Sequence, residues 1–426
     1  MTEASEDDTI TITTSFEITK PIVIDKAVTV TADEDVVLTA KGDFSASNFD
    51  PHVFRLYHAD AVLDNVTVVI DESNSSNVNI VYLHAGTVQN CNFTGSGATD
   101  NPVTRGVMVE SGAKNVVIKD NVFNGFFASA YINSGATGDI IDNESKNTKE
   151  SWCIADGSNM DLTGNTFEGT TTIDIKIFAD SPSQTNNYTK EKFLAMSENN
   201  SSAHIQNEID GVTALDGSII VSDKDSLEKA IEYADATETP IALQAVITGD
   251  FVIDANKNVS LDLNGHKITN ESDHTITNNG TLTIKDSSDG KTGKITNSTH
   301  GKGALVNNYG GTVDIESGTL TREEAIGNSW YVISNGGTMN IKGGSIINKV
   351  VKLTSSLIRN EGEMDISGGY LEHDFIAVKN DDTGKGELST LTVSGDVVIK
   401  SPEQAIQNWT TAVISGGTMN GKVSTW

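Results

Sequence analysis

The chain contains little cysteine, proline or arginine. Two cysteines in 426 residues, Cys91 and Cys153, are too few for a disulfide framework. Six prolines against 38 glycines indicate that Gly, Asn and Asp make most of the turns. No apolar run approaches the roughly 20 residues that a transmembrane helix needs. These shortages exclude a disulfide-stapled fold and a membrane insertion within this sequence.

Positive charge is also scarce. The 29 lysines and arginines face 59 aspartates and glutamates, which gives a net charge of −30. A body this acidic repels phosphate backbones and anionic lipid headgroups, so nucleic acid and membrane surfaces are excluded as partners. The charge allows loose binding of calcium or another divalent cation. We expect no other cofactor.

An internal repeat dominates the C-terminal half. Six units contain an apolar residue, any residue and then asparagine, ending at Asn278, Asn308, Asn335, Asn360, Asn380 and Asn408. Each is followed by a second strand-like apolar pair, and then by glycine and a third apolar site. Three short strands per unit are typical of a solenoid rung. Asparagine at one corner of successive rungs predicts an internal ladder of side-chain amides.

The N-terminal half has a different rung motif, Asn-x-Phe-x-Gly. It begins at Asn121 and Asn165, with a degenerate copy at Asn143, so the spacing is 22 residues twice. Cys91 occupies the same slot one rung earlier, and we expect it to be a small buried residue there. This half is therefore predicted to be a second stack of compact rungs.

The sequence predicts two β-helical units in tandem. The first spans 1–180, a terminal loop with a short helix spans 181–217, and the second unit spans 218–426. Apolar residues with helical spacing predict a helix at about 225–235, with Asp225 or Ser226 as its N-terminal cap. A solenoid end exposes apolar and backbone groups, so we expect this helix to cover the start of the second unit.

Both halves resemble the right-handed parallel β-helix, or pectin-lyase-like, superfamily, over roughly 10–180 and 218–426. In the C-terminal half, 261–268 (LDLNGHKI) and 336–344 (GGTMNIKGG) resemble rungs of bacterial cell-surface and adhesin-like proteins. The resemblance implies an all-β, elongated right-handed parallel β-helix with three short strands per rung. It also implies an extracellular or cell-surface protein, whose signal and anchor would lie outside these 426 residues.

Enzyme motifs of that superfamily do not stand out. The Gly-His-Gly and Arg-Ile-Lys elements of polygalacturonase-type hydrolases do not occur. Asp381 and Asp382 form a carboxylate pair, but they lie in an Asn-Asp-Asp-Thr-Gly sequence that is typical of a turn. The four arginines are scattered, so pectate-lyase chemistry gains little support.

One constellation carries a site hypothesis. Aligning the N-terminal strands places His58, His84 and Glu110 on neighbouring rungs, about 5 Å apart, on the outer face. Two imidazoles and a carboxylate at that separation fit a divalent-metal site or an acid–base pair. The candidates for binding a ligand beside them are Tyr82, Arg105, Tyr131 and Trp152. The alternative is an ordinary half-polar sheet, or a one-residue slip that turns the histidines inward.

The leading functional hypothesis is a non-catalytic, adhesin-like or structural surface module. It would be monomeric and bind a glycan or a host or cell-surface protein. One alternative is a carbohydrate-active enzyme, either a polysaccharide lyase or a glycoside hydrolase, with its site on the N-terminal helix. Another alternative is a structural component of a surface layer or filament.

Overall fold

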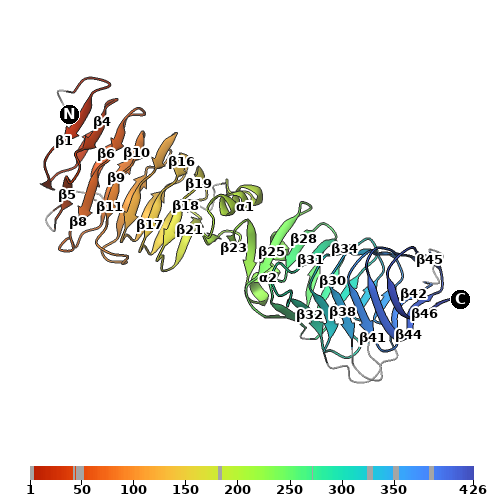
Figure 1. The fold of residues 1–426 in the computed structure, drawn as a ribbon. Helices are drawn as coiled ribbons and strands as arrows, with labels where there is room; N and C mark the ends of the chain where they lie inside the picture. Colours follow the sequence, from red (N-terminus) through yellow and green to blue (C-terminus); the bar gives the residue numbers. More distant parts are fainter. Residues whose placement is uncertain are drawn as a thin grey trace. The chain divides into compact units, whose positions relative to one another are not determined.

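The chain folds as a parallel β-solenoid, and each turn adds a strand to each of three parallel sheets. The structure is a computed structural model that describes residues 4–41, 44, 52–180, 185–270, 272–323, 330–348, 355–382 and 388–426. These residues make about 15 turns. Contacts divide the chain into two compact units, Met1–Ser218 and Ile219–Trp426 (Figure 1). The mainly β fold with three sheets per rung, predicted from the sequence, is confirmed.

In the first unit, 21 described strands form the three sheets. Sheet 1 comprises β1 (Thr9–Ile12), β4 (Thr29–Ala32), β7 (Val62–Asp64), β10 (Thr87–Gln89), β13 (Val116–Lys119), β16 (Thr137–Ile141) and β19 (Asn159–Thr163). Sheet 2 comprises β2 (Phe16–Ile18), β5 (Val37–Ala40), β8 (Thr67–Ile70), β11 (Asn92–Thr94), β14 (Val122–Asn124), β17 (Glu144–Lys146) and β20 (Thr166–Glu168). Sheet 3 comprises β3 (Ile22–Ile24), β6 (His52–Leu56), β9 (Val78–Leu83), β12 (Thr104–Val109), β15 (Ala128–Ile132), β18 (Glu150–Ala155) and β21 (Ile173–Phe178).

The period-2 apolar pattern explains these strands. Alternate side chains of a strand point to opposite faces of its sheet, so one set lines the solenoid interior. Val68 lies between Leu38 of the preceding rung and Phe93 of the next, and all three are buried. Equivalent side chains therefore stack into continuous apolar columns that run through the first unit.

A ladder of asparagines marks one corner of the first unit. Asn121 Nδ2 donates to Asn143 Oδ1 at 2.9 Å, and Asn143 Nδ2 donates to Asn165 Oδ1 at 3.0 Å. Asn165 continues the ladder to Asn200, which sequence spacing did not reveal. Cys91 is buried in the same column, and its backbone amide donates to Asn121 Oδ1 at 3.0 Å. The prediction of a small buried residue at Cys91 is confirmed.

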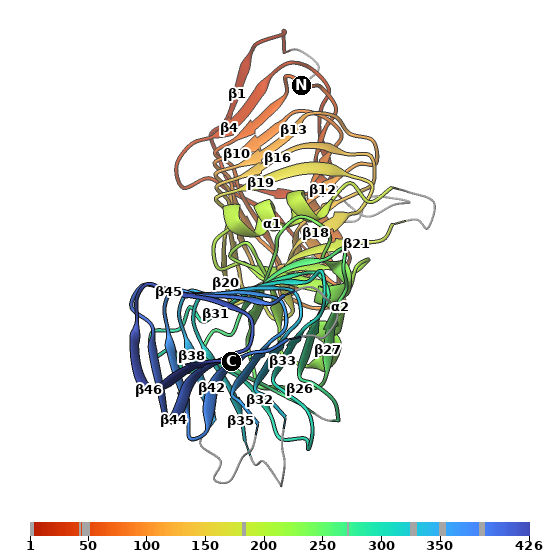
Figure 2. The same cartoon turned by 90° about the vertical axis from the view of Figure 1, so that its right-hand side faces the viewer.

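A short helix and two short strands follow the last rung of the first unit. They are α1 (Lys190–Asn199), β22 (Ile205–Asn207) and β23 (Val212–Leu215). Phe193 and Met196 of α1 are buried, and the helix lies beside β19 in both views (Figures 1 and 2). The helix thus covers the end of the apolar columns, as an exposed solenoid end requires.

The second unit begins with β24 (Ser218–Val221) and α2 (Lys224–Tyr233), and three series of strands follow. The first series is β25 (Thr239–Leu243), β28 (Asn258–Asp262), β31 (Thr281–Lys285), β34 (Thr312–Ile315), β37 (Thr338–Ile341), β40 (Glu363–Ile366), β43 (Thr390–Val393) and β45 (Thr411–Ile414). The second is β26 (Ile247–Thr248), β29 (Lys267–Thr269), β32 (Lys294–Asn297), β35 (Thr319–Arg322), β38 (Ser345–Asn348), β41 (Tyr370–His373), β44 (Val398–Asn408) and β46 (Thr418–Thr425). The third is β27 (Phe251–Ile253), β30 (Ile276–Asn278), β33 (Leu305–Asn307), β36 (Ile333–Asn335), β39 (Ile358–Asn360) and β42 (Ile376–Asn380).

The predicted asparagine ladder of the second unit is confirmed, with one correction. Amide-to-amide hydrogen bonds of 2.7–2.9 Å join Asn278, Asn307, Asn335, Asn360, Asn380 and Asn408 in order. Asn308 was wrong as a ladder residue, because Asn307 pairs with Asn278 and Asn335. The turn after β33 is longer than the turns after β30 and β36. The sequence alignment therefore placed the ladder position one residue too late, at Asn308. Asn308 lies outside the solenoid and donates to Asn279 Oδ1.

The predicted helix near the start of the second unit is present as α2. Its N-cap is Asp223, whose carboxylate accepts from Ser226 N at 2.8 Å, while Ser226 Oγ accepts from Asp223 N at 3.1 Å. The prediction of Asp225 or Ser226 as the N-terminal cap was wrong, because Ser226 lies at the third helical position, where it completes a capping box with Asp223. Leu227 of α2 packs over Phe251 and Val259 of the first rungs, around a cavity of only about 10 Å³. The helix therefore covers this end of the apolar interior.

Candidate functional site

The outer face of sheet 3 in the first unit carries two columns of side chains, most of them polar or aromatic. One column contains Arg55, Tyr82, Met108, Tyr131 and Cys153. The other contains Tyr57, His84, Glu110, Asn133 and Ala155, which follow the buried ends of the same strands. We call this surface the tyrosine face and define it by Tyr57, Tyr82, His84, Arg105, Glu110 and Tyr131. The outward orientation predicted for Tyr82, His84, Glu110 and Tyr131 agrees with this register.

His58 does not join His84 and Glu110, so this part of the site hypothesis was wrong. Leu56 pairs with Leu83, which places Tyr57 rather than His58 beside His84, with 5.6 Å between ring centroids. His58 lies one residue later, in a turn where its backbone carbonyl accepts a hydrogen bond from the Ala61 amide. Its Nδ1 accepts from the Asp60 amide at 3.1 Å. The His-Ala sequence at 58–59 and at 84–85 had suggested that His58 and His84 are equivalent. The pairing of the buried Leu56 with Leu83 shows that they are not.

Glu110 joins two side chains of the tyrosine face. His84 Nδ1 donates to Glu110 Oε2 at 2.5 Å. The Tyr82 hydroxyl also donates to Glu110, and the pKa of Tyr82 is raised well above its usual range, first by burial and then by this carboxylate. In a neutral imidazole, the bond to Glu110 requires the proton on Nδ1 and leaves Nε2 as an acceptor. The pair therefore has the geometry of a carboxylate-oriented imidazole.

Arg105 and Tyr131 form the second contact of the face. The Arg105 guanidinium carbon lies 4.8 Å from the Tyr131 ring centroid, in cation–π geometry. Its Nη1 donates to Asn79 Oδ1 at 3.4 Å. The centroid of the Phe178 ring lies 5.2 Å from that of the Tyr131 ring. Burial raises the pKa of the Tyr131 hydroxyl. These contacts hold both predicted ligand-binding side chains in fixed positions.

Trp152 was wrong as a ligand-binding residue. Its side chain is 0% exposed, because Trp152 pairs with Ala130 in an inward column. Its ring packs edge-on against Phe123 at 5.5 Å and against Phe167 at 6.2 Å. Trp152 is therefore part of the hydrophobic core of the first unit.

The proposed metal site does not form. Among the residues that the structure describes, no three His, Cys, Asp or Glu side chains come close enough together to hold a metal ion. The separation of His58 from the His84–Glu110 pair is the reason. The pair by itself offers one imidazole and one carboxylate, which are too few protein ligands for a metal site.

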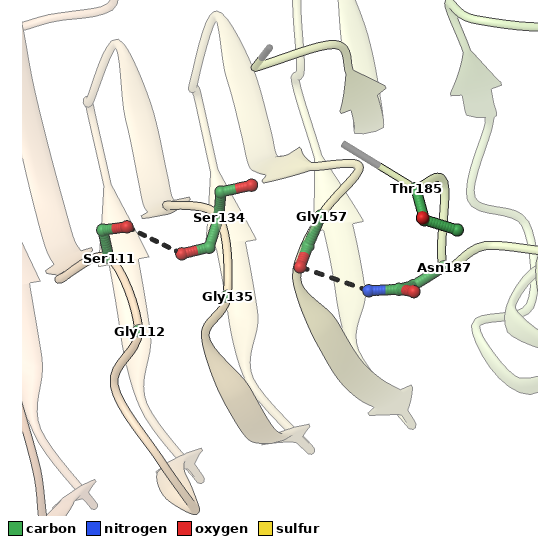
Figure 3. Close-up of a pocket in the computed structure, with 7 residues that line it drawn as sticks. All are labelled: Ser111, Gly112, Ser134, Gly135, Gly157, Thr185 and Asn187. Atoms are coloured by element: carbon green, nitrogen blue, oxygen red, sulfur yellow. Dashed lines mark hydrogen bonds between the residues drawn. The ribbon is translucent and has the colours of Figure 1, made fainter. Parts of the chain in front are cut away.

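A shallow pocket adjoins the tyrosine face at the turns that end β12, β15 and β18. Its volume is about 450 Å³, and its lining is Ser111, Gly112, Ser134, Gly135, Gly157, Thr185 and Asn187 (Figure 3). Ser111 Oγ donates to the Ser134 carbonyl at 2.9 Å, and Asn187 Nδ2 donates to the Gly157 carbonyl at 3.2 Å. Ser111 directly follows Glu110, so the pocket extends the tyrosine face with hydroxyl and amide groups.

The comparisons with known proteins add no family. No family model matches the chain, and no characterised protein or solved structure shows significant similarity to it. The fold is therefore established as a parallel β-solenoid, while the finer resemblance to pectin-lyase-like or adhesin-like proteins remains a proposal. Within the described ranges, no helix is long and apolar enough to cross a membrane.

Sequence reasoning missed three contributors to the site. Tyr57 belongs to the face, and aligning Leu56 with Leu83 would have revealed it. Thr185 and Asn187 line the pocket from the segment after the last rung, whose polar sequence gave no sign of where it packs. Asn187 is placed by its own amide, which donates to the Asp156 carbonyl at 3.0 Å.

Proposed function

We propose that this chain is an extracellular, non-catalytic binding module that recognises a glycan along the tyrosine face. The observation that carries the proposal is the set of tyrosine rings on this face: Tyr57 and Tyr82 on adjacent rungs, and Tyr131 two rungs beyond Tyr82. Aromatic faces pack on the apolar faces of sugar rings, and the polar edges of the same residues bind hydroxyl groups. Glu110 and Arg105 supply an acceptor and a donor between them.

The rigidity of the face supports recognition of a ligand. Tyr82 lies 4.5 Å from the His52 ring and donates to Glu110, while Tyr131 lies between Arg105 and Phe178. Side chains held in this way lose little conformational entropy when a ligand binds. Rungs repeat at about 4.8 Å, so a polymer that runs along the solenoid axis meets Tyr57, Tyr82 and Tyr131 in order. The net charge of −30 disfavours a nucleic acid as that polymer.

Binding of the full chain to an array of neutral and acidic glycans tests the proposal. Tyr82→Ala and Tyr131→Ala should each weaken binding about tenfold, because each removes an aromatic contact. Phe16→Ala is the matched control, since Phe16 is an exposed aromatic on sheet 2 of the same unit. Binding that ignores the tyrosine substitutions, or falls equally with the control, contradicts the proposal.

The His84–Glu110 pair favours a second candidate, a carbohydrate-active enzyme. A carboxylate that holds Nδ1–H leaves Nε2 of His84 as a proton acceptor on the surface of the face. Assays for new reducing ends and for unsaturated products, run on the glycans that bind, separate the two candidates. Turnover that disappears in His84→Ala and Glu110→Gln would establish the enzyme. Binding without turnover supports the non-catalytic module.

A further inference from the structure

A groove runs along the asparagine-ladder corner of the second unit, far in sequence from the tyrosine face. Its volume is about 1000 Å³. We call it the Tyr309 groove and define it by Tyr309, Ser334, Gly336, Glu361, Glu363 and Leu388, which are among its lining residues. It lies where β33, β36 and β39 turn into β34, β37 and β40.

Unequal turn lengths create this groove. The turns 336–337 and 361–362 have two residues each, whereas the turns 308–311 before them and 381–389 after them are longer. The short turns form the floor, and Tyr309 and Leu388 form the two walls, on rungs that are three apart, or about 14 Å. Gly337 and Gly362 are required for close stacking, because an added Cβ would come within 2.2 Å of a neighbouring carbonyl oxygen.

Gly336 is not required for close stacking of the rungs, but it leaves space in the floor of the groove. A Cβ built there would meet its nearest atom at 3.5 Å, an ordinary contact, and the residue has no positive φ. The absence of a side chain at Gly336 therefore keeps the floor open without any demand from the backbone. This distinguishes it from Gly337, the next residue in the same turn.

The walls and the floor differ in chemistry. Tyr309 is 82% exposed on one wall, and Leu388 is 65% exposed on the other. The floor carries the Ser334 and Thr338 hydroxyls and the carboxylates of Glu361 and Glu363.

The basic groups beside the groove are neutralised. Arg359 Nη2 lies 2.7 Å from Glu361 Oε1, and Asp381 Oδ2 lies 3.0 Å from Arg359 Nε and 2.9 Å from Lys379 Nζ. Two carboxylates thus balance two cations, and Glu363 leaves the floor with a net negative charge. An anionic ligand would be repelled from this floor.

We propose that the Tyr309 groove binds a neutral glycan chain, as a second site independent of the tyrosine face. One sugar ring packs on the Tyr309 ring and another ring of the same chain packs against Leu388, and hydroxyls of the chain between them donate to Glu361 and Glu363. The carboxylates accept these hydrogen bonds from neutral hydroxyl groups. The ligand therefore needs no phosphate or uronate groups, which a basic groove would bind.

A peptide strand fits this groove less well than a glycan. Addition of a strand needs an open sheet edge. Here β36 is already paired on both sides, with β33 and β39, and β37 is paired with β34 and β40. The groove therefore offers side chains and a flat floor but no unpaired ladder of backbone groups.

The test uses the full chain on immobilised mannan, xylan, galactan and β-glucan, with alginate and a lysine-rich peptide alongside. We expect binding to at least one neutral polysaccharide that is weakened about tenfold by Tyr309→Ala. Gly336→Phe should abolish this binding by filling the floor, whereas Tyr309→Phe should retain it because the ring remains. Tyr370→Ala is the matched control, since Tyr370 lies on another strand series of the same unit.

The outcomes separate this site from the tyrosine face. Binding that is lost in Tyr309→Ala but kept in Tyr82→Ala supports the groove even if the tyrosine face binds nothing. The proposal is overturned if no neutral polysaccharide responds to both Tyr309→Ala and Gly336→Phe. It is also overturned if these variants, with unchanged circular dichroism, lose binding only to the lysine-rich peptide or to alginate.

Discussion

Removing one amide from the middle of the second ladder should destabilise the solenoid strongly. Asn335 is completely buried, and its Nδ2 donates to Asn360 Oδ1 at 2.8 Å while its Oδ1 accepts from Asn307 Nδ2 at 2.8 Å. In Asn335→Ala each neighbour loses one hydrogen bond, although Asn307 Nδ2 keeps the Thr338 carbonyl and Asn360 Oδ1 keeps the Gly362 amide. A hydrogen bond contributes about 0.5–1.5 kcal/mol net, so the loss of two ladder bonds should cost about 1–3 kcal/mol.

The ladder's end provides a graded comparison. Asn408 accepts from Asn380 Nδ2 at 2.7 Å but has no following asparagine among the described residues, so Asn408→Ala breaks one ladder bond and should cost about half as much. Asn308→Ala is the surface control, because the exposed Asn308 side chain donates to Asn279 Oδ1 outside the ladder. Its effect should stay within about 0.5 kcal/mol.

Urea unfolding of the full chain, together with amide hydrogen exchange of β36 and β39, measures these differences. Hydrogen exchange is needed because stacked repeats open locally and one global transition need not describe them. We expect the order Asn335→Ala, Asn408→Ala, Asn308→Ala in decreasing loss of stability. Equal stability of Asn335→Ala and Asn308→Ala would refute the ladder as a source of stability.

Three further predictions concern single groups. In Asp286→Asn we expect a lower urea midpoint at neutral pH, because the Asp286 carboxylate accepts from the amides of Gly265 and Gly293. Burial raises the pKa of Asp286, but these hydrogen bonds and those from Ser288 lower the pKa overall. The stabilisation exists above the unfolded-state pKa of about 4 and is lost as pH falls through the folded pKa, so the two midpoints should converge in acid, and a constant difference would contradict this. Asp223→Ala should cost about 1 kcal/mol and speed hydrogen exchange in α2, with unchanged exchange arguing against the cap. Glu110→Gln should lower the raised pKa of Tyr82, as followed by the ultraviolet absorbance of tyrosinate, and an unchanged titration would mean that burial alone raises it.

The sequence predicted the repeating parts of the fold well and the irregular parts poorly. Asparagine at one corner and alternate apolar residues are periodic signals, so the three-strand rungs and the ladder of the second unit could be read directly. Where a turn changes length, the period shifts by one residue without any local sign. This is why Asn308 stood in the place of Asn307, and His58 in the place of Tyr57.

The candidate site shows the same limit. The pairing of His84 with Glu110 followed from strand register, which the sequence specifies through buried leucines and valines. Trp152 was misassigned because a tryptophan in a half-polar strand suits both a surface and a core position, and only the packing around Phe123 decides. The pocket residues Thr185 and Asn187 come from a segment without periodicity, so no pattern could place them.

Hydroxyl-radical footprinting of the full chain, with and without its best-bound glycan, is the most direct measurement of where the ligand sits. The account predicts that oxidation of Tyr57, Tyr82 and Tyr131 falls when the glycan is present, while Phe16 on sheet 2 is oxidised equally in both states. Unchanged oxidation of all three tyrosines at saturating glycan would contradict the central claim that the outer face of sheet 3 recognises the ligand.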